Sequence, residues 1–135
     1  MITAVDTNIL FDILMPDPVF GPESLKKLRA SSQDGALVIC EVVYTEAAGI
    51  FPEQAAFNRF LEQSGIEFKP SHPETLWRAG RMWRRFCLER PRASEVSRRI
   101  AAGFLIGAHA LLQAEQLLTR DRGFYKTTFS GLQLA

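Results

Sequence analysis

Hydrophobic residues recur along this chain with two spacings that alternate from one segment to the next. Short continuous apolar runs predict buried strands, and apolar residues three or four positions apart predict helices. The predicted strands are residues 2–5, 36–40, 66–69, 116–119 and 132–134. The predicted helices are residues 9–14, 23–33, 41–51, 53–63, 72–89 and 98–114, and residues 120–128 are expected to form a loop. This alternation indicates an α/β fold whose mostly parallel sheet is covered on both faces.

The length and composition indicate one ordinary globular domain spanning residues 1–135. Hydrophobic residues make up 47% of the chain and charged residues 23%, which excludes disordered and collagen-like proteins. The longest nearly apolar run, residues 100–112, is shorter than the roughly 18–20 residues that a membrane span needs. The first residues lack the basic region of a signal peptide, and Cys40 and Cys87 have no metal-binding spacing. We therefore expect a cytoplasmic protein with reduced thiols and no membrane contact.

The net charge of +1 conceals a strongly basic segment at residues 78–99. This segment contains eight arginines and two acids, so its net charge is +6, whereas the rest of the chain has a net charge of −5. Arginine favours forked contacts with phosphate or carboxylate, so the segment indicates a nucleic-acid backbone or an acidic partner. A solvated helix face is the alternative. The arginines are Arg78, Arg81, Arg84, Arg85, Arg90, Arg92, Arg98 and Arg99.

Two acids directly follow predicted strands. Asp6 comes after the first strand, and Asp121 comes after the strand at 116–119. Ligands of open parallel sheets bind beyond the carboxyl ends of the strands, so both acids are candidates for a site. Asp6 is also a good helix N-cap, and Asp121 a good turn residue. Asn8 is placed to orient the Asp6 carboxylate or to contact a phosphate.

Glu46 is a third candidate because it lies within an otherwise apolar segment. A carboxylate is costly to bury without a partner, and the helical spacing places Glu46 close to the inward face. Glu41 lies roughly 140° further round the same helix and is expected to be solvated. If Asp6, Glu46 and Asp121 converge, a cation must hold them together. Mg²⁺ or Mn²⁺ suits such oxygen ligands and could activate water against a phosphodiester.

Several other chemistries find no support in the sequence. It contains no GxSxG, Walker A, GxGxxG or HExxH motif, so nucleophilic acyl transfer and nucleotide-fuelled chemistry have no support. His109 lies in an apolar helix and is expected to be a hydrogen-bonded core residue. A phosphotransferase that uses Asp6 as nucleophile is a weak alternative, because Asn8 breaks the usual Asp-x-Asp spacing.

Four short motifs, in order, resemble the PIN domain, and in particular VapC-type toxins of bacterial toxin–antitoxin pairs. They are Val5-Asp6-Thr7-Asn8-Ile9-Leu10, Val43-Tyr44-Thr45-Glu46, Phe104-Leu105-Ile106-Gly107-Ala108-His109-Ala110, and Leu117-Leu118-Thr119-Arg120-Asp121-Arg122-Gly123-Phe124-Tyr125. The resemblance implies an α/β/α sandwich, a Mg²⁺- or Mn²⁺-dependent endoribonuclease, a cognate antitoxin and a homodimer. It also implies that Asp6, Glu46 and Asp121 form the catalytic metal site, supported by Asn8 and Thr119. Arg78, Arg81, Arg85 and Arg122 are then expected to contact the RNA backbone.

Gly103 departs from the pattern of that family. The family places an aspartate directly before the Phe-Leu-Ile-Gly-Ala-His stretch, where it is a principal metal ligand. Glycine offers no side-chain oxygen, so either the site works with three acids and extra water, or the activity is weakened or lost. The rival hypothesis is a binding module that holds RNA or its antitoxin without cleaving. We expect Gly103→Asp to tighten Mg²⁺ or Mn²⁺ binding and to raise ribonuclease activity, with some loss of stability in the absence of metal.

Overall fold

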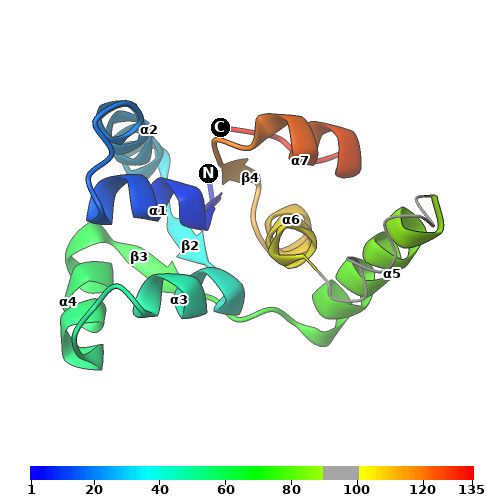
Figure 1. The fold of residues 1–135 in the computed structure, drawn as a ribbon, viewed down its shortest axis with the longest axis horizontal. Coiled ribbons are helices and arrows are strands. Elements are labelled where there is room, and N and C mark those ends of the chain that lie inside the picture. The colour runs from blue at the N-terminus through cyan, green and yellow to red at the C-terminus, as the bar shows by residue number, and fades with distance from the viewer. Residues whose placement is uncertain (90–100) are drawn as a thin grey trace.

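A four-stranded parallel sheet forms the centre of the protein (Figure 1). The computed structural model describes residues 1–89 and 101–135. The strands are β1 (Thr3–Val5), β2 (Leu37–Ile39), β3 (Ile66–Phe68) and β4 (Gln116–Leu118), in the order β3-β2-β1-β4. The predicted last strand is reduced to one parallel bridge between Leu117 and Leu134.

Seven helices in the described residues flank this sheet. Helix α5 packs on α6, α6 packs on β1 and β4, and α1 packs on α2 and α3 (Figure 1). This α/β arrangement with a parallel sheet confirms the predicted fold class. In the described part of the chain, no helix has the length and apolar character that crossing a membrane requires. The helices are α1 (Thr7–Leu14), α2 (Gly21–Asp34), α3 (Glu41–Ala48), α4 (Gln54–Ser64), α5 (Pro73–Glu89), α6 (Ala102–Gln113) and α7 (Arg122–Thr128).

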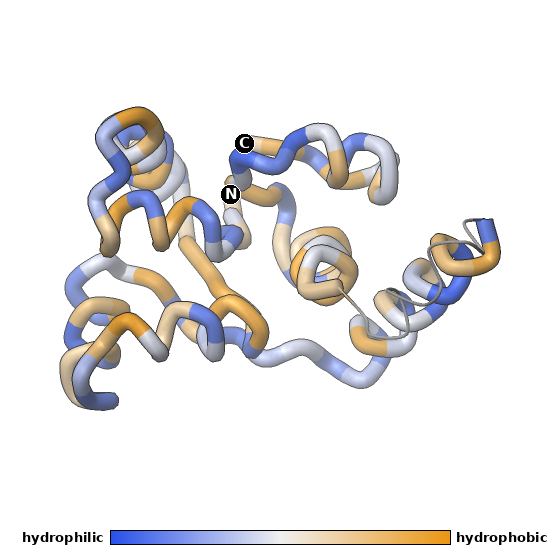
Figure 2. The backbone as a smooth tube through the Cα atoms, in the orientation of Figure 1, coloured by the Kyte–Doolittle hydropathy of each residue, from blue (hydrophilic) through white to orange (hydrophobic). Residues whose placement is uncertain are grey.

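The core is built on β1, β2 and β4, whose residues are all buried, and on the apolar helix α6. The tube of α6 is hydrophobic over most of its length (Figure 2). His109 of this helix is 1% exposed, and its Nε2 lies 2.8 Å from the carbonyl oxygen of Lys69. Burial lowers the pKa of His109, so it is a neutral core residue, as predicted.

The prediction of a loop at residues 120–128 is wrong, because most of that segment forms α7. Tyr125 and Phe129 are 2% and 1% exposed, and the Phe129 N–H donates to the Tyr125 carbonyl. Burial of two aromatic side chains one helical turn apart outweighs the turn tendency of Gly123. Their four-residue spacing was the available sequence signal.

Helix α5 places its arginines outward, as its pattern predicts. Arg78, Arg81 and Arg85 are exposed, whereas Ala79 is buried. Leu76 is an exception to the predicted inward face, since 43% of it is exposed. Arg90, Arg92, Arg98 and Arg99 lie outside the described residues, as does the predicted start of the next helix at residue 98.

Candidate functional site

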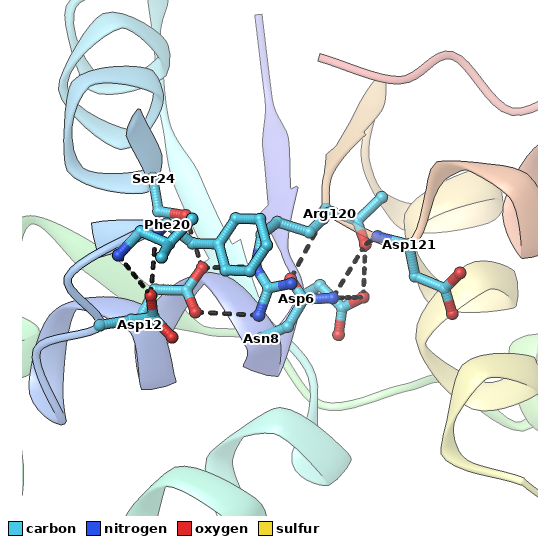
Figure 3. Close-up of polar contacts among 10 residues, drawn as sticks. Asp6, Asn8, Asp12, Phe20, Ser24, Arg120 and Asp121 are labelled. Atoms are coloured by element: carbon cyan, nitrogen blue, oxygen red, sulfur yellow. Dashed lines mark hydrogen bonds and ion pairs between the residues drawn. The ribbon is translucent and has the colours of Figure 1, made fainter. Parts of the chain in front are cut away.

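Asp6 is a buried carboxylate at the carboxyl end of a central strand. It directly follows β1 and is 6% exposed. It occupies the N-cap position of α1, but its side chain makes no capping hydrogen bond. Instead, its Oδ2 accepts a 2.7 Å hydrogen bond from the Thr119 hydroxyl and a 3.3 Å bond from the Asn8 amide (Figure 3). The capping interpretation therefore does not describe this side chain, which is turned toward the end of β4.

The surroundings of Asp6 set its charge and that of its neighbour Tyr125. Burial raises the pKa of Asp6, hydrogen bonds from Thr119 and Tyr125 oppose the shift, and the negative charge of Glu46 adds to it. Burial, together with the nearby charge of Asp6, raises the pKa of Tyr125 far above its ordinary value. The phenol consequently stays protonated and can donate to the Asp6 carboxylate.

Glu46 lies beside this carboxylate but is exposed, which corrects the expected position near the inward face of α3. The Thr7 hydroxyl donates a 2.8 Å hydrogen bond to Glu46 Oε1. Since Thr7 follows Asp6 in the chain, this bond holds Glu46 next to the buried acid. Glu46 therefore lies on the solvent side of an otherwise apolar helix and is still close to Asp6.

Glu41 is partly buried, contrary to the expectation of a solvated acid. Its two carboxylate oxygens accept hydrogen bonds from the Ser71 backbone N–H, at 3.0 Å, and the Ser71 hydroxyl, at 2.6 Å. Burial opposes ionisation, but these bonds outweigh it and hold the pKa of Glu41 below its ordinary value. Glu41 therefore ties α3 to the segment between β3 and α5.

Asp121 follows β4 at the same edge of the sheet, and its carboxylate is exposed. Its backbone N–H donates to the Thr119 hydroxyl at 3.0 Å, so Thr119 links both acids. In Figure 3 the Asp121 side chain points away from Asp6. Within residues 1–89 and 101–135, no three acidic, histidine or cysteine side chains are close enough together to hold one metal ion.

Sequence reasoning missed an ion pair next to these acids. Arg120 Nε and Nη2 donate to the two oxygens of Asp12 at 2.6 and 2.9 Å, and the Ser24 hydroxyl donates to Asp12 Oδ2 at 2.6 Å (Figure 3). Burial opposes ionisation of Asp12, but Arg120 and Ser24 outweigh it and hold its pKa below the ordinary value. The Arg120 backbone N–H donates to Asn8 Oδ1 at 3.2 Å. The ion pair therefore anchors the segment that carries Asp121.

The space beside Gly103 is occupied by an aromatic ring. A Cβ at residue 103 would lie 2.6 Å from Phe124 Cε1 and 3.1 Å from its Cζ, too close for real atoms. Phe124 also packs edge-on against Phe104, with 5.5 Å between ring centroids. Any side chain at residue 103, including that of Gly103→Asp, therefore requires Phe124 to move.

Three arginines of α5 line a groove beside the segment that follows α7. Arg78, Arg81 and Arg85 share a hollow of about 630 Å³ with Thr128 and Ser130. Arg122 lies apart from this groove, at the start of α7, where Nη1 donates to the Ala135 carbonyl at 2.7 Å. The arginines predicted to contact RNA thus fall into two places.

The three candidate acids suit a divalent cation by their chemistry. Asp6, Glu46 and Asp121 come from three elements and supply the hard oxygen ligands that Mg²⁺ and Mn²⁺ prefer. Within the described part of the chain, no lysine or arginine forms an ion pair with any of them. The side chains of Glu46 and Asp121 are exposed, and both would have to turn toward Asp6 for the three to share one ion.

Comparison with known proteins identifies a domain family and similar folds. Residues 3–130 match the PIN domain. The fold is similar to a chain in the crystal structure of VapBC2 from Rickettsia felis bound to a DNA fragment from their promoter, with a TM-score of 0.65, 17% identity, and coverage of 100% of this chain and 98% of that one. It is also similar to a chain of VapBC-1 from nontypeable Haemophilus influenzae, with a TM-score of 0.64, 21% identity, and coverage of 100% and 97%. No curated protein matches the chain. With its fold and nearly its whole length matched, the chain belongs to the PIN domain family.

Proposed function

We propose that this protein is a Mg²⁺- or Mn²⁺-dependent endoribonuclease that acts as the toxin of a toxin–antitoxin pair. The observation that carries the proposal is the set of Asp6, Glu46 and Asp121, which lie beyond the carboxyl ends of neighbouring parallel strands without basic partners in the described residues. PIN domains of the VapC type are generally nucleases, which supports the same conclusion.

In this proposal each residue at the edge of the sheet has a defined task. Asp6 and Asp121 hold the ion, and Glu46 orients the attacking water. Thr119 and Asn8 fix the Asp6 carboxylate, and the Thr7 hydroxyl fixes Glu46. A bound Mg²⁺ or Mn²⁺ supplies a polarised water and neutralises charge on the phosphodiester.

The partners follow from the charge of the surface and from the neighbours in structure. Arg78, Arg81, Arg85 and Arg122 contact the RNA backbone, which sets affinity and not sequence choice. Both similar structures are VapBC complexes, so we propose a cognate antitoxin that covers the acidic site. We also propose a homodimer, which light scattering on the purified chain would detect as twice the mass of 15.2 kDa.

The test is to replace Asp6 and to measure metal binding and RNA cleavage separately. We expect the parent to bind Mn²⁺ in calorimetry and to cleave RNA, and Asp6→Asn to lose both. Losing a residue that only orients a metal ligand costs metal sites about 10–100-fold in affinity, so losing Asp6 itself should cost at least as much. The matched control is Asp34→Asn, the same change at an exposed acid where α2 ends, which should behave like the parent. Equal Mn²⁺ affinity of Asp6→Asn and the parent would contradict the proposal.

The second candidate function is a PIN-fold module that binds RNA or its antitoxin without cleaving. The contact between Gly103 and Phe124 favours it, because a ring stands where the resemblance places a metal ligand. Cleavage assays with Mn²⁺ separate the two functions. A pure binding module leaves RNA intact at any protein concentration, whereas a weakened enzyme cleaves in proportion to concentration.

A further inference from the structure

Phe20 is an aromatic side chain held in an exposed position beside the acidic site. Asp17 Oδ1 accepts hydrogen bonds from the backbone N–H groups of Val19 and Phe20, both at 2.8 Å. The Gly21 N–H donates to the Asp17 carbonyl at 2.8 Å, which closes the same turn. Phe20 is nevertheless 44% exposed. The turn therefore presents an apolar ring to solvent in a fixed place, which burial in the core does not explain.

The ring packs on a cation that is itself fixed. The Arg120 guanidinium lies 4.1 Å from the centre of the Phe20 ring, and Asp12 holds that guanidinium by two hydrogen bonds (Figure 3). Aromatic rings and arginine planes are the surfaces on which unstacked bases of single-stranded RNA pack. Because both members are held in advance, little ordering is needed when a base binds.

The stacked Phe20 and Arg120 form part of the wall of a pocket. Its volume is about 350 Å³, within the range of small-molecule sites. Thr119, whose hydroxyl donates to Asp6, forms part of the wall, so the pocket adjoins the proposed metal site. Asp12 balances the charge of Arg120, and Lys27 and Arg122 add two positive charges against the one carboxylate of Glu23. The pocket is lined by Ile9, Phe20, Glu23, Ser24, Lys27, Thr119, Arg120 and Arg122.

We propose that this pocket is a nucleotide subsite, which holds one base of single-stranded RNA against Phe20. The neighbouring phosphate then lies near Lys27 and Arg122, and the chain continues toward Asp6. The proposal deepens the ribonuclease function and rests on it. The positive charge of the pocket, its aromatic wall and Thr119, which the pocket shares with the acidic site, favour RNA over a protein segment as the occupant.

The experiment measures RNA affinity without cleavage, by fluorescence anisotropy of a labelled single-stranded oligoribonucleotide in EDTA. Phe20→Ala should weaken binding by about tenfold, since stacking on one aromatic side chain contributes about 1–3 kcal/mol per base. Phe20→Trp keeps a stacking surface and should keep the affinity. The matched control is Phe68→Ala, which removes a ring of similar exposure, 41%, from the strand at the far edge of the sheet.

A second measurement separates base stacking from a general effect on the fold. Oligoribonucleotides with one abasic position, scanned along the strand, should bind the parent protein more weakly at one position in particular. Removing the same base should not change the RNA affinity of Phe20→Ala, because this variant no longer has the ring on which the base stacks.

The outcomes distinguish this proposal from the proposed function. Parent-like RNA affinity of Phe20→Ala would overturn the subsite, and so would an abasic penalty that persists in that variant. Weaker antitoxin binding with unchanged RNA binding would also overturn it and would identify the pocket as a protein contact. If the parent binds no RNA in EDTA and neither binds nor cleaves RNA with Mn²⁺, the ribonuclease function fails together with the subsite.

Discussion

Replacing Gly103 by alanine places one methyl group against the ring of Phe124. The new Cβ would lie 2.6 Å from Phe124 Cε1, so the ring has to rotate or α6 has to shift. Overpacking of this kind costs about 1–3 kcal/mol. A glycine-to-alanine change inside a helix gains about 1 kcal/mol, but residue 103 lies in the first turn of α6, where the gain is smaller. We therefore expect Gly103→Ala to lower the free energy of unfolding by about 1 kcal/mol.

Urea unfolding in EDTA measures this change, with Gly80→Ala as its control. Gly80 sits inside α5, and a Cβ built on it meets no atom of another described part of the chain within 4 Å, so its replacement should stabilise the protein by about 0.5–1 kcal/mol. Shortening the ring with Phe124→Leu should remove the penalty at residue 103 in the double variant. If Gly103→Ala stabilises the protein as much as Gly80→Ala does, Phe124 does not occupy that space and the reasoning fails.

Aspartate at residue 103 extends the same test to the metal. Combined with Phe124→Leu, Gly103→Asp gains room for its side chain and adds an acid to the first turn of α6, which is favourable by about 0.3–1 kcal/mol. In the absence of metal, repulsion from the other acids should offset this gain. We expect the double variant to bind Mn²⁺ more tightly than Phe124→Leu, seen as a larger rise in unfolding midpoint with added Mn²⁺. Equal rises would show that residue 103 does not face the acids.

Three further predictions concern the arginines, the ion pair and the core histidine. Charge reversal at Arg81 and Arg85 should weaken RNA binding and flatten its dependence on salt, because fewer counterions are released; an unchanged slope would exclude them from the RNA contact. Arg120→Gln should cost about 2 kcal/mol of unfolding free energy at pH 7, because it leaves the buried Asp12 without its charged partner. The pKa of Asp12 is held below 3.8, so the stabilisation from this pair is complete above pH 3.8 and is lost as the pH falls further. An acid unfolding curve of Arg120→Gln that matches the parent curve would refute this. The pKa of His109 is lowered from 6.5, so the folded protein binds fewer protons than the unfolded chain, and its stability should fall as the pH drops below 6.5. In urea unfolding, the stability of His109→Gln should therefore change less between pH 7 and pH 5 than that of the parent.

Local patterns in the sequence determined the architecture and the positions of two candidate site residues. Continuous apolar runs fit strands that are buried on both faces, and the acids that directly follow two of them, Asp6 and Asp121, necessarily fall at the carboxyl edge of a parallel sheet. The nearly all-apolar α6 could only be a buried helix, with His109 in its core. These conclusions depend on neighbouring residues and on the geometry of one strand or helix, which a single chain displays directly.

Contacts between distant residues were decided only by the tertiary structure. Asp12 and Arg120 are 108 positions apart, and nothing local in either segment marks them as a pair. Glu46 reaches the site from the solvent side of α3 because Thr7 happens to meet it there, which helical periodicity cannot show. In the sequence, Gly103 is likewise only a position without a side chain. The packing of α7 alone places the ring of Phe124 in the space beside it. Periodicity fixes which face of an element turns inward, whereas the partner that meets each side chain depends on how the elements dock against one another.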